Sequence, residues 1–237
     1  MQPGRRTIEG ELGAALEKIA GAPVPLTVAG RTDAGVHAMG QVASLDVDPV
    51  PEALAPRLND QLPDEIVVWS AEPAPDGFDA RRDARSRVYR YRVLSAPTPS
   101  PFERGRALFW PHRLDRAALD ACAAALPGAH EFTAFTPTET THRRFEREVL
   151  RAEWITEPLD PPHPGELLEL WIEADSFMRH MVRILVGTML EVAGGRRQID
   201  EFTRLLGGAP RSDAGPTAKP EGLYLAAVRY ERRGRPR

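Results

Sequence analysis

The chain has 237 residues, of which 42% are hydrophobic and 27% charged, and its formal net charge is −3. This length predicts one large domain or two small ones, and the weak negative charge by itself gives no argument for a nucleic-acid partner. The single cysteine, Cys122, excludes a disulfide framework and fits a reducing compartment; with no signal peptide visible and no apolar run long enough to cross a bilayer, we expect a cytoplasmic protein.

The first part of the chain predicts a mixture of helices and strands. A helix begins at the N-cap Thr7, carries apolar residues at helical spacing and ends at Gly21. Further elements are expected at 25–28 (strand), 41–47 (strand), 51–59 (helix), 66–70 (strand) and 86–94 (strand).

A Pro-rich segment at 97–106 is the best candidate for a linker between an N-terminal half, 1–96, and a C-terminal half, 107–237. The second half predicts a helix capped by Asp115, a loop at 127–144, strands at 148–155, 166–174 and 223–230, a turn at 158–164, and helices at 177–193 and 200–206. Because helices and strands mix without strict β-α-β alternation, we expect an α+β fold of two similar α/β halves with a largely antiparallel mixed sheet.

The loop at 30–38 holds one carboxylate, Asp33, between two predicted strands. Gly, Asp and Thr are turn-forming residues, so a plain turn explains the loop. Alternatively, a carboxylate mounted at a strand end is typical of a nucleophile or base, which then needs a cationic partner. Candidates for that partner are Arg31 and Arg183, although an arginine on a largely apolar helix is usually a surface residue whose charge reaches water.

Residues 81–92 form a dense basic stretch with six arginines and two tyrosines. In an extended strand, Tyr89 and Tyr91 would share one face, and Arg90 and Arg92 the other. Cations that follow phosphates and rings that stack on bases are typical of binding to unpaired nucleic acid. A half-exposed edge strand protected by charge explains the stretch equally well.

The six histidines show no spacing typical of metal ligands. The sequence also has no phosphate-binding loop, dinucleotide fingerprint or serine-nucleophile elbow. Any chemistry is therefore expected to use side chains alone.

Several motifs resemble, in order, those of the tRNA pseudouridine synthase A family, and the likeness covers nearly the whole chain. The most specific is Gly-Arg-Thr-Asp-Ala-Gly-Val-His-Ala at 30–38, followed by Gln-Val at 41–42. The others are Leu-Asn at 58–59 with Leu-Pro-x-x-Ile at 62–66, Phe-x-Ala-Arg at 78–81 with Tyr-x-Tyr at 89–91, His-x-Phe-x-Ala-Phe at 130–135, the segment 177–183 with Gly187, and Thr-Ala at 217–218 with Glu-Gly-Leu-Tyr-Leu at 221–225.

The resemblance implies the pseudouridine synthase fold, with the active-site cleft between the two halves. It implies an enzyme that isomerises uridine to pseudouridine at positions 38, 39 and 40 of the tRNA anticodon stem-loop. Asp33 is implied as the nucleophile, Arg183 as its ion-pair partner and Tyr89 as the ring that stacks on the target base. Whether Asp33 attacks the ribose C1′ or the base C6 stays open. The residues assigned to substrate binding are Arg31, which helps to hold the place of the flipped-out nucleotide, and Thr32, His37, Tyr91, Arg81 and Arg179.

The family is homodimeric and its isomerisation has no redox step, so the resemblance implies a tRNA-binding homodimer without cofactor or metal. Family members usually begin with a further strand and an Asp-Gly-Thr loop, ahead of the segment that matches residues 2–4. A hypothesis from another class is a catalytically silent RNA-binding protein of the same fold. A third, an Asp-dependent hydrolase, lacks a supporting metal or base motif.

Overall fold

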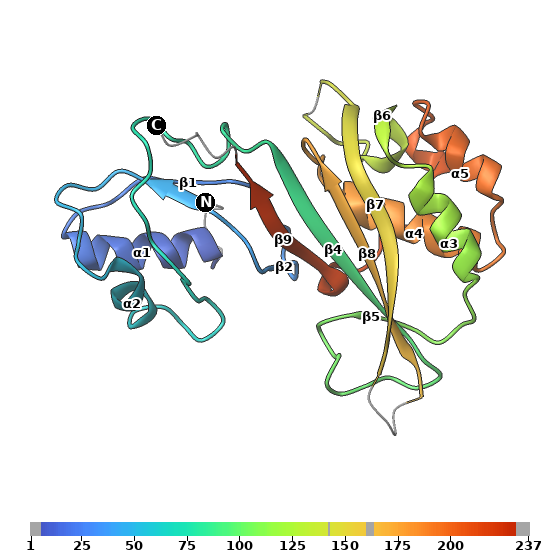
Figure 1. Cartoon of the computed structure of the whole chain (residues 1–237), viewed down its shortest axis with the longest axis horizontal. Coiled ribbons are helices and arrows are strands. Elements are labelled where there is room, and N and C mark those ends of the chain that lie inside the picture. The colour runs from blue at the N-terminus through green and yellow to red at the C-terminus, as the bar shows by residue number, and fades with distance from the viewer. Residues whose placement is uncertain (1–5, 142, 160–163, 231–237) are drawn as a thin grey trace, which may run out of the picture. The chain divides into compact units, whose positions relative to one another are not determined.

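Figure 1 shows the computed structural model of the chain, in which residues 6–141, 143–159 and 164–230 are described. The N-terminal residues 1–5 and residues 160–163 of the expected turn lie outside this described part. Contacts divide the chain into two compact units. Unit 1 contains residues 1–31 and 41–84, and unit 2 contains residues 32–40 and 85–237.

Unit 1 begins with the predicted helix, α1 (Ile8–Ala20). The Thr7 hydroxyl accepts a hydrogen bond from the Gly10 N–H at 3.1 Å, and Gly21 ends the helix in the left-handed conformation with φ 76°. The other elements are β1 (Leu26–Val28), which pairs antiparallel with β3 (Ala43–Leu45), and α2 (Leu54–Asn59). Ala15, Leu16 and Leu58 form the buried centre of this unit.

The strand expected at 66–70 is wrong: these residues are not in a strand, and Val68 at their centre pairs with a side chain. The Asn59 amide donates to the Val68 carbonyl at 2.9 Å and accepts from the Val68 N–H at 2.7 Å. A single asparagine thus satisfies the backbone groups that a strand partner would otherwise satisfy. The flanking side chains of Val67 and Trp69 are exposed.

Unit 2 is built on a sheet that has seven strands within the described residues. Their order is β2 (His37–Ala38), β9 (Leu223–Arg229), β4 (Ser86–Ser95), β8 (Glu166–Ala174), β7 (Glu146–Pro158) and β6 (Gly128–Glu131), with β5 (Leu108–Trp110) also paired to β4. Among the strand pairs of the described residues, β2–β9 and β4–β5 are parallel and the others in this sheet are antiparallel. The expected α+β fold with a largely antiparallel mixed sheet is therefore confirmed.

Three helices pack on one face of this sheet, which we call the inner face (Figure 1): α3 (Arg116–Ala124), α4 (Met181–Ala193) and α5 (Ile199–Leu205). The alternation predicted for the basic strand is present in β4. Tyr91 lies in the core beneath the helices, whereas Arg90 and Arg92 reach Glu169 on the opposite, outer face. Short 3-10 turns, η1 (Thr133–Phe135), η2 (Arg211–Asp213) and η3 (Pro220–Gly222), complete the unit.

Two boundaries differ from the prediction. The helix expected at 177–193 begins at Met181, because His180 adopts the left-handed conformation with φ 62° and the Met181 N–H bonds back to the Met178 carbonyl. Arg179 consequently lies ahead of the helix that carries Arg183. The loop expected at 127–144 contains β6, which pairs with the N-terminal part of β7 and so widens the sheet by one strand.

The strand β4, expected to close the N-terminal half, is hydrogen-bonded to β8 and β9 of the C-terminal half. The two compact units are defined by contacts between residues, whereas the predicted halves are defined by the Pro-rich segment at 97–106, so the two divisions describe different things. The division into 1–96 and 107–237 stays a prediction. None of the helices in the described part of the chain has the length and apolar composition that a membrane span requires.

Candidate active site

The Asp33 loop lies in unit 2, where it leads into the edge strand β2. The Val36 N–H closes a turn onto the Asp33 carbonyl at 3.1 Å, and Gly35 within the turn has φ 82°. A β-carbon at Gly35 would stand 3.0 Å from the Pro220 ring, so glycine suits both the backbone and the space. The turn interpretation and a functional carboxylate are thus compatible, since the turn presents the Asp33 side chain.

Arg183 reaches the Asp33 carboxylate from α4, although 150 positions separate the two residues in sequence. Its Nη1 lies 3.1 Å from Asp33 Oδ2, and its Nε donates to the Ala218 carbonyl at 2.7 Å. The Arg183 side chain is 13% exposed, so it is not a surface arginine that extends into water. The guanidinium is held at two points, which fixes its direction toward Asp33.

The segment that holds Arg183 approaches α4 at Gly187. A β-carbon there would stand 1.8 Å from the Pro216 carbonyl oxygen, which a side chain of any size excludes. The Ala218 N–H in turn donates to the Arg183 carbonyl at 3.0 Å. One glycine on α4 therefore allows the contact that positions the arginine one turn earlier.

His180 is a residue of this site that the sequence motifs did not single out. Its Nε2 lies 3.2 Å from Asp33 Oδ2, the same oxygen that Arg183 contacts. Burial lowers the pKa of His180 from 6.5, opposed by the Asp33 charge. The only signal in the sequence was its spacing, three positions before Arg183, which places both at the start of one helix.

Tyr89 lies beside this carboxylate on the inner face. Its ring packs edge-on against Phe177, with centroids 4.9 Å apart. Burial raises the pKa of the Tyr89 hydroxyl to about 12; the Arg87 charge opposes this shift and the Asp33 charge adds to it. The phenol is therefore neutral at physiological pH and stands within electrostatic reach of Asp33.

Tyr91, two positions further along β4, is fully buried. Its hydroxyl donates to the Lys219 carbonyl at 2.7 Å, and burial strongly raises its pKa. The ring also packs against Gly222, where a β-carbon would stand 2.8 Å from it. This burial speaks against direct contact of Tyr91 with a substrate and gives the ring a supporting place beneath the segment that holds Arg183.

The arginines on the outer face of β4 are bound to carboxylates. Glu169, whose side chain is 4% exposed, accepts from Arg92 Nε at 3.0 Å and pairs with Arg90 Nη1 at 3.4 Å. Arg92 also donates to Glu103, and the Arg90 guanidinium lies over the ring of Tyr224, 4.8 Å from its centroid. The protective role proposed for an edge strand does not apply to β4, which lies inside the sheet, and these cations are already paired.

The remaining predicted substrate-binding residues are distributed over both units. His37 stacks on Tyr224 and donates from Nε2 to the Gly105 carbonyl at 2.9 Å. Thr32 is half-buried and Arg179 is exposed, both in unit 2. Arg31 and Arg81 are exposed residues of unit 1.

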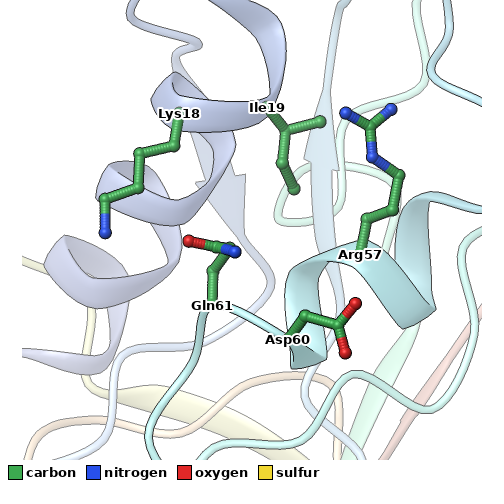
Figure 2. A pocket seen from close by; sticks show the side chains of 5 residues that line it. All are labelled: Lys18, Ile19, Arg57, Asp60 and Gln61. Carbon is green, nitrogen blue, oxygen red and sulfur yellow. The ribbon is translucent and has the colours of Figure 1, made fainter.

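A hollow of about 210 Å³ in unit 1 lies between α1 and the end of α2. Figure 2 shows its lining side chains, which are Lys18, Ile19, Arg57, Asp60 and Gln61. Ligand sites are usually larger and mostly apolar, whereas Ile19 is the single apolar side chain here. In the described part of the chain, His, Cys, Asp and Glu side chains do not gather in a group of three that could hold a metal ion.

Known proteins resemble this chain over most of its length. A family model described as tRNA pseudouridine synthase matches residues 122–231. A tRNA pseudouridine synthase A from Geobacillus sp. (strain WCH70) is 38% identical over 234 residues, which is 98% of this chain and 92% of that protein. Proteins of the same name from Frankia casuarinae and Thermus thermophilus are 43% and 42% identical, over 97% and 96% of this chain and 82% and 88% of theirs.

Proposed function

The chain belongs to the tRNA pseudouridine synthase A family, and on this premise we propose that it isomerises uridine to pseudouridine at positions 38, 39 and 40 of the tRNA anticodon stem-loop. The observation that carries the proposal is the pairing of Asp33 with Arg183, from two motifs that lie 150 positions apart. A partly exposed carboxylate fixed by a largely enclosed guanidinium, 13% exposed, is what a side-chain nucleophile requires.

The reaction breaks the bond between N1 of the base and C1′ of the ribose, rotates the base and forms a bond from C5 to C1′. The proton on C5 leaves and N1 gains one, so atoms and electrons balance without an oxidant or reductant. We propose that an Asp33 oxygen bonds to the nucleotide, at C1′ or at C6, and is released when the product forms. Arg183 stabilises the carboxylate charge before attack and after release.

Tyr89 is proposed to stack on the target base, with Phe177 fixing the tilt of its ring. The target must leave its helical stack, which costs a few kcal/mol and makes a stacking partner valuable. The proposed substrate contacts further include Arg31, Thr32, His37, Arg81 and Arg179. For Tyr91 we propose an indirect contribution, through its hydrogen bond to Lys219.

We also propose that the protein works as a homodimer in the cytoplasm. The likeness of its motifs to a homodimeric family supports the first part. A single cysteine, Cys122, supports a reducing compartment. Sedimentation of the purified protein across a range of concentrations tests the dimer directly.

The test of the function uses unmodified tRNA transcripts that carry uridine at positions 38, 39 or 40. Incubation with the protein, followed by chemical mapping of pseudouridine, is expected to give product at these positions. Tight tRNA binding without product would favour the alternative, a catalytically silent RNA-binding protein of the same fold. Product at other positions only would retain the enzyme class and overturn the site assignment.

A further inference from the structure

Two nitrogen atoms, one of His180 and one of Arg183, lie close to a single oxygen of Asp33. His180 Nε2 lies 3.2 Å and Arg183 Nη1 3.1 Å from Oδ2. Within the described residues, Oδ1 of Asp33 has neither a hydrogen-bond partner nor an ion-pair partner, and the side chain is 33% exposed. The carboxylate is therefore asymmetric, with one oxygen held by the protein and the other open.

The backbone at His180 is unusual for this residue. It has φ 62° at the N-cap of α4, a conformation that side chains with a β-carbon adopt at a cost of about 1–2 kcal/mol. The side chain makes no capping hydrogen bond to the helix. The contact that the imidazole does make is the one with Asp33, so the strained backbone directs the ring to the carboxylate and not to the helix start.

Resting on the proposed function, we propose that His180 is a positioning residue of the isomerisation, which together with Arg183 holds Oδ2 of Asp33 and presents Oδ1 to the nucleotide. When Oδ1 bonds to carbon, Oδ2 becomes the carbonyl oxygen of the adduct. When the adduct breaks, the electron pair of the carbon–oxygen bond returns to the carboxylate. In the proposed reacting complex His180 keeps its proton on Nε2 and donates it to Oδ2, which sets the direction of attack and stabilises the departing carboxylate.

The charges that face His180 come from four elements of the chain. Asp33 of the loop before β2 attracts a proton to the imidazole, whereas Arg183 of α4, Arg179 ahead of it and Arg211 of η2 disfavour one. Burial acts in the same direction as the arginines, so the pKa of His180 lies below 6.5. At neutral pH the ring is therefore uncharged, and the proposal places its single proton on Nε2, the nitrogen 3.2 Å from Asp33 Oδ2. Protonation would add a second cation at Oδ2 and draw charge from Oδ1, so the rate should fall as the pH drops through this pKa.

The test compares H180G, H180N and H180Q with the wild type and with H112Q, a control at an exposed histidine after β5. Glycine and asparagine suit the left-handed backbone, so these variants should fold. Both lack a donor at the distance of Nε2, and their single-turnover rate should fall about 10- to 100-fold, while tRNA affinity stays within about twofold. The glutamine amide nitrogen stands as far from the backbone as Nε2, so H180Q should stay within about fivefold of wild type.

A pH series separates positioning from a structural role. The wild-type rate should fall below its plateau under acidic conditions, and H180Q should lack this part of the decline because glutamine does not titrate. A wild-type rate in H180G, equal rates in H180N and H180Q, or the same acid decline in H180Q would each overturn the assignment. An active wild type with any of these results leaves the proposed function intact. An inactive wild type overturns both.

Discussion

Two carboxylates of unit 2 contact arginine, Glu169 on the outer face of the sheet and Asp33 beside α4 on the inner face. The two clusters differ in how much of the carboxylate is exposed. On the outer face, Glu169 is 4% exposed and contacts Arg90, Arg92 and the Trp171 Nε1 at 3.2 Å. On the inner face, Asp33 is 33% exposed, and Arg183 Nη1 and His180 Nε2 both lie close to one of its oxygens, Oδ2. On the outer face, ion pairs with Glu169 join β4 to β8. On the inner face, we propose, the contacts with Asp33 orient its open oxygen toward the substrate.

The largest effect expected from this contrast is that of D33N. The carboxamide keeps the shape of the side chain and loses the charge and the nucleophilic oxygen, so product formation should fall by about 10³-fold or more. Affinity for tRNA should stay within about threefold, because the arginines proposed to contact the tRNA are unchanged in this variant. Single-turnover assays and filter binding measure the two quantities. Retained turnover would remove Asp33 from its proposed role.

The sequence predicted the members of the inner cluster better than their arrangement. Asp33 and Arg183 could be assigned because their motifs resemble a known family, whereas periodicity alone favoured a turn and a surface arginine. The contact between them depends on 150 intervening residues that no local pattern describes. His180 was missed because its position depends on a left-handed backbone at the start of α4, which shortened the predicted helix by one turn.

For the arginines around Glu169 on the outer face, the sequence predicted the arrangement of the side chains but not their partner. The alternation of β4 correctly placed Arg90 and Arg92 on one face, yet their partner Glu169 comes from β8, 77 positions after Arg92. The dense run of arginines left nucleic-acid binding and a charge-protected edge strand equally open, and in the structure Arg90 and Arg92 are paired with carboxylates. The strand expected at 66–70 failed for a related reason, since the side chain of Asn59 replaced the strand partner.

The second largest effect is expected at Gly187, where close packing positions Arg183 against Asp33. In G187A the new β-carbon would overlap the Pro216 carbonyl, so segment 216–218 must move and release Arg183. We expect the free energy of unfolding to fall by at least ~3 kcal/mol, with a parallel loss of turnover in the folded fraction. Urea denaturation and single-turnover assays measure both.

The matched control is G13A in α1, where a β-carbon meets nothing within 4 Å. The free energy of unfolding of this variant should rise by about 0.5–1 kcal/mol, because alanine restricts the unfolded chain and favours the helix. If G187A were as stable as G13A, the close approach at Gly187 would not be what positions Arg183.

A third experiment applies the D33N change to the other face. In E169Q the amide leaves two half-buried guanidinium groups with weaker acceptors, so the free energy of unfolding should fall by about 1.5–3 kcal/mol. The rate of the folded protein should stay within about twofold of wild type, because among the described residues Glu169 contacts Arg90, Arg92 and Trp171 and none of the proposed catalytic residues. A large loss of rate at full stability would show that the two faces are not separate in function.

The smallest expected effect is a difference in stability between two variants, Y91F and Y89F, whose tyrosines lie on the same face of β4. Tyr91 donates to the Lys219 carbonyl, so Y91F should lower the free energy of unfolding by about 1–2 kcal/mol. The Tyr89 hydroxyl has no hydrogen-bond partner among the described residues, so Y89F should change it by less than ~0.5 kcal/mol at neutral pH. Chemical denaturation at pH 7.5 measures both values. Equal losses would place the two rings in the same supporting role.

The pH dependence of stability sharpens this last contrast. Burial raises the pKa of Tyr89 from 10.0 to about 12, and that of Tyr91 in the same direction. Above pH 10 the unfolded state therefore loses phenolic protons that the folded state keeps, and stability falls as the pH rises. Y89F should remove part of this loss without changing stability at pH 7.5. Y91F should have a lower free energy of unfolding at pH 7.5 than the wild type, and this free energy should fall less as the pH rises above 10. A wild-type decline that both variants reproduce in full would mean that neither ring is desolvated in the folded protein, and that Tyr91 is as open to solvent as the Asp33 side chain.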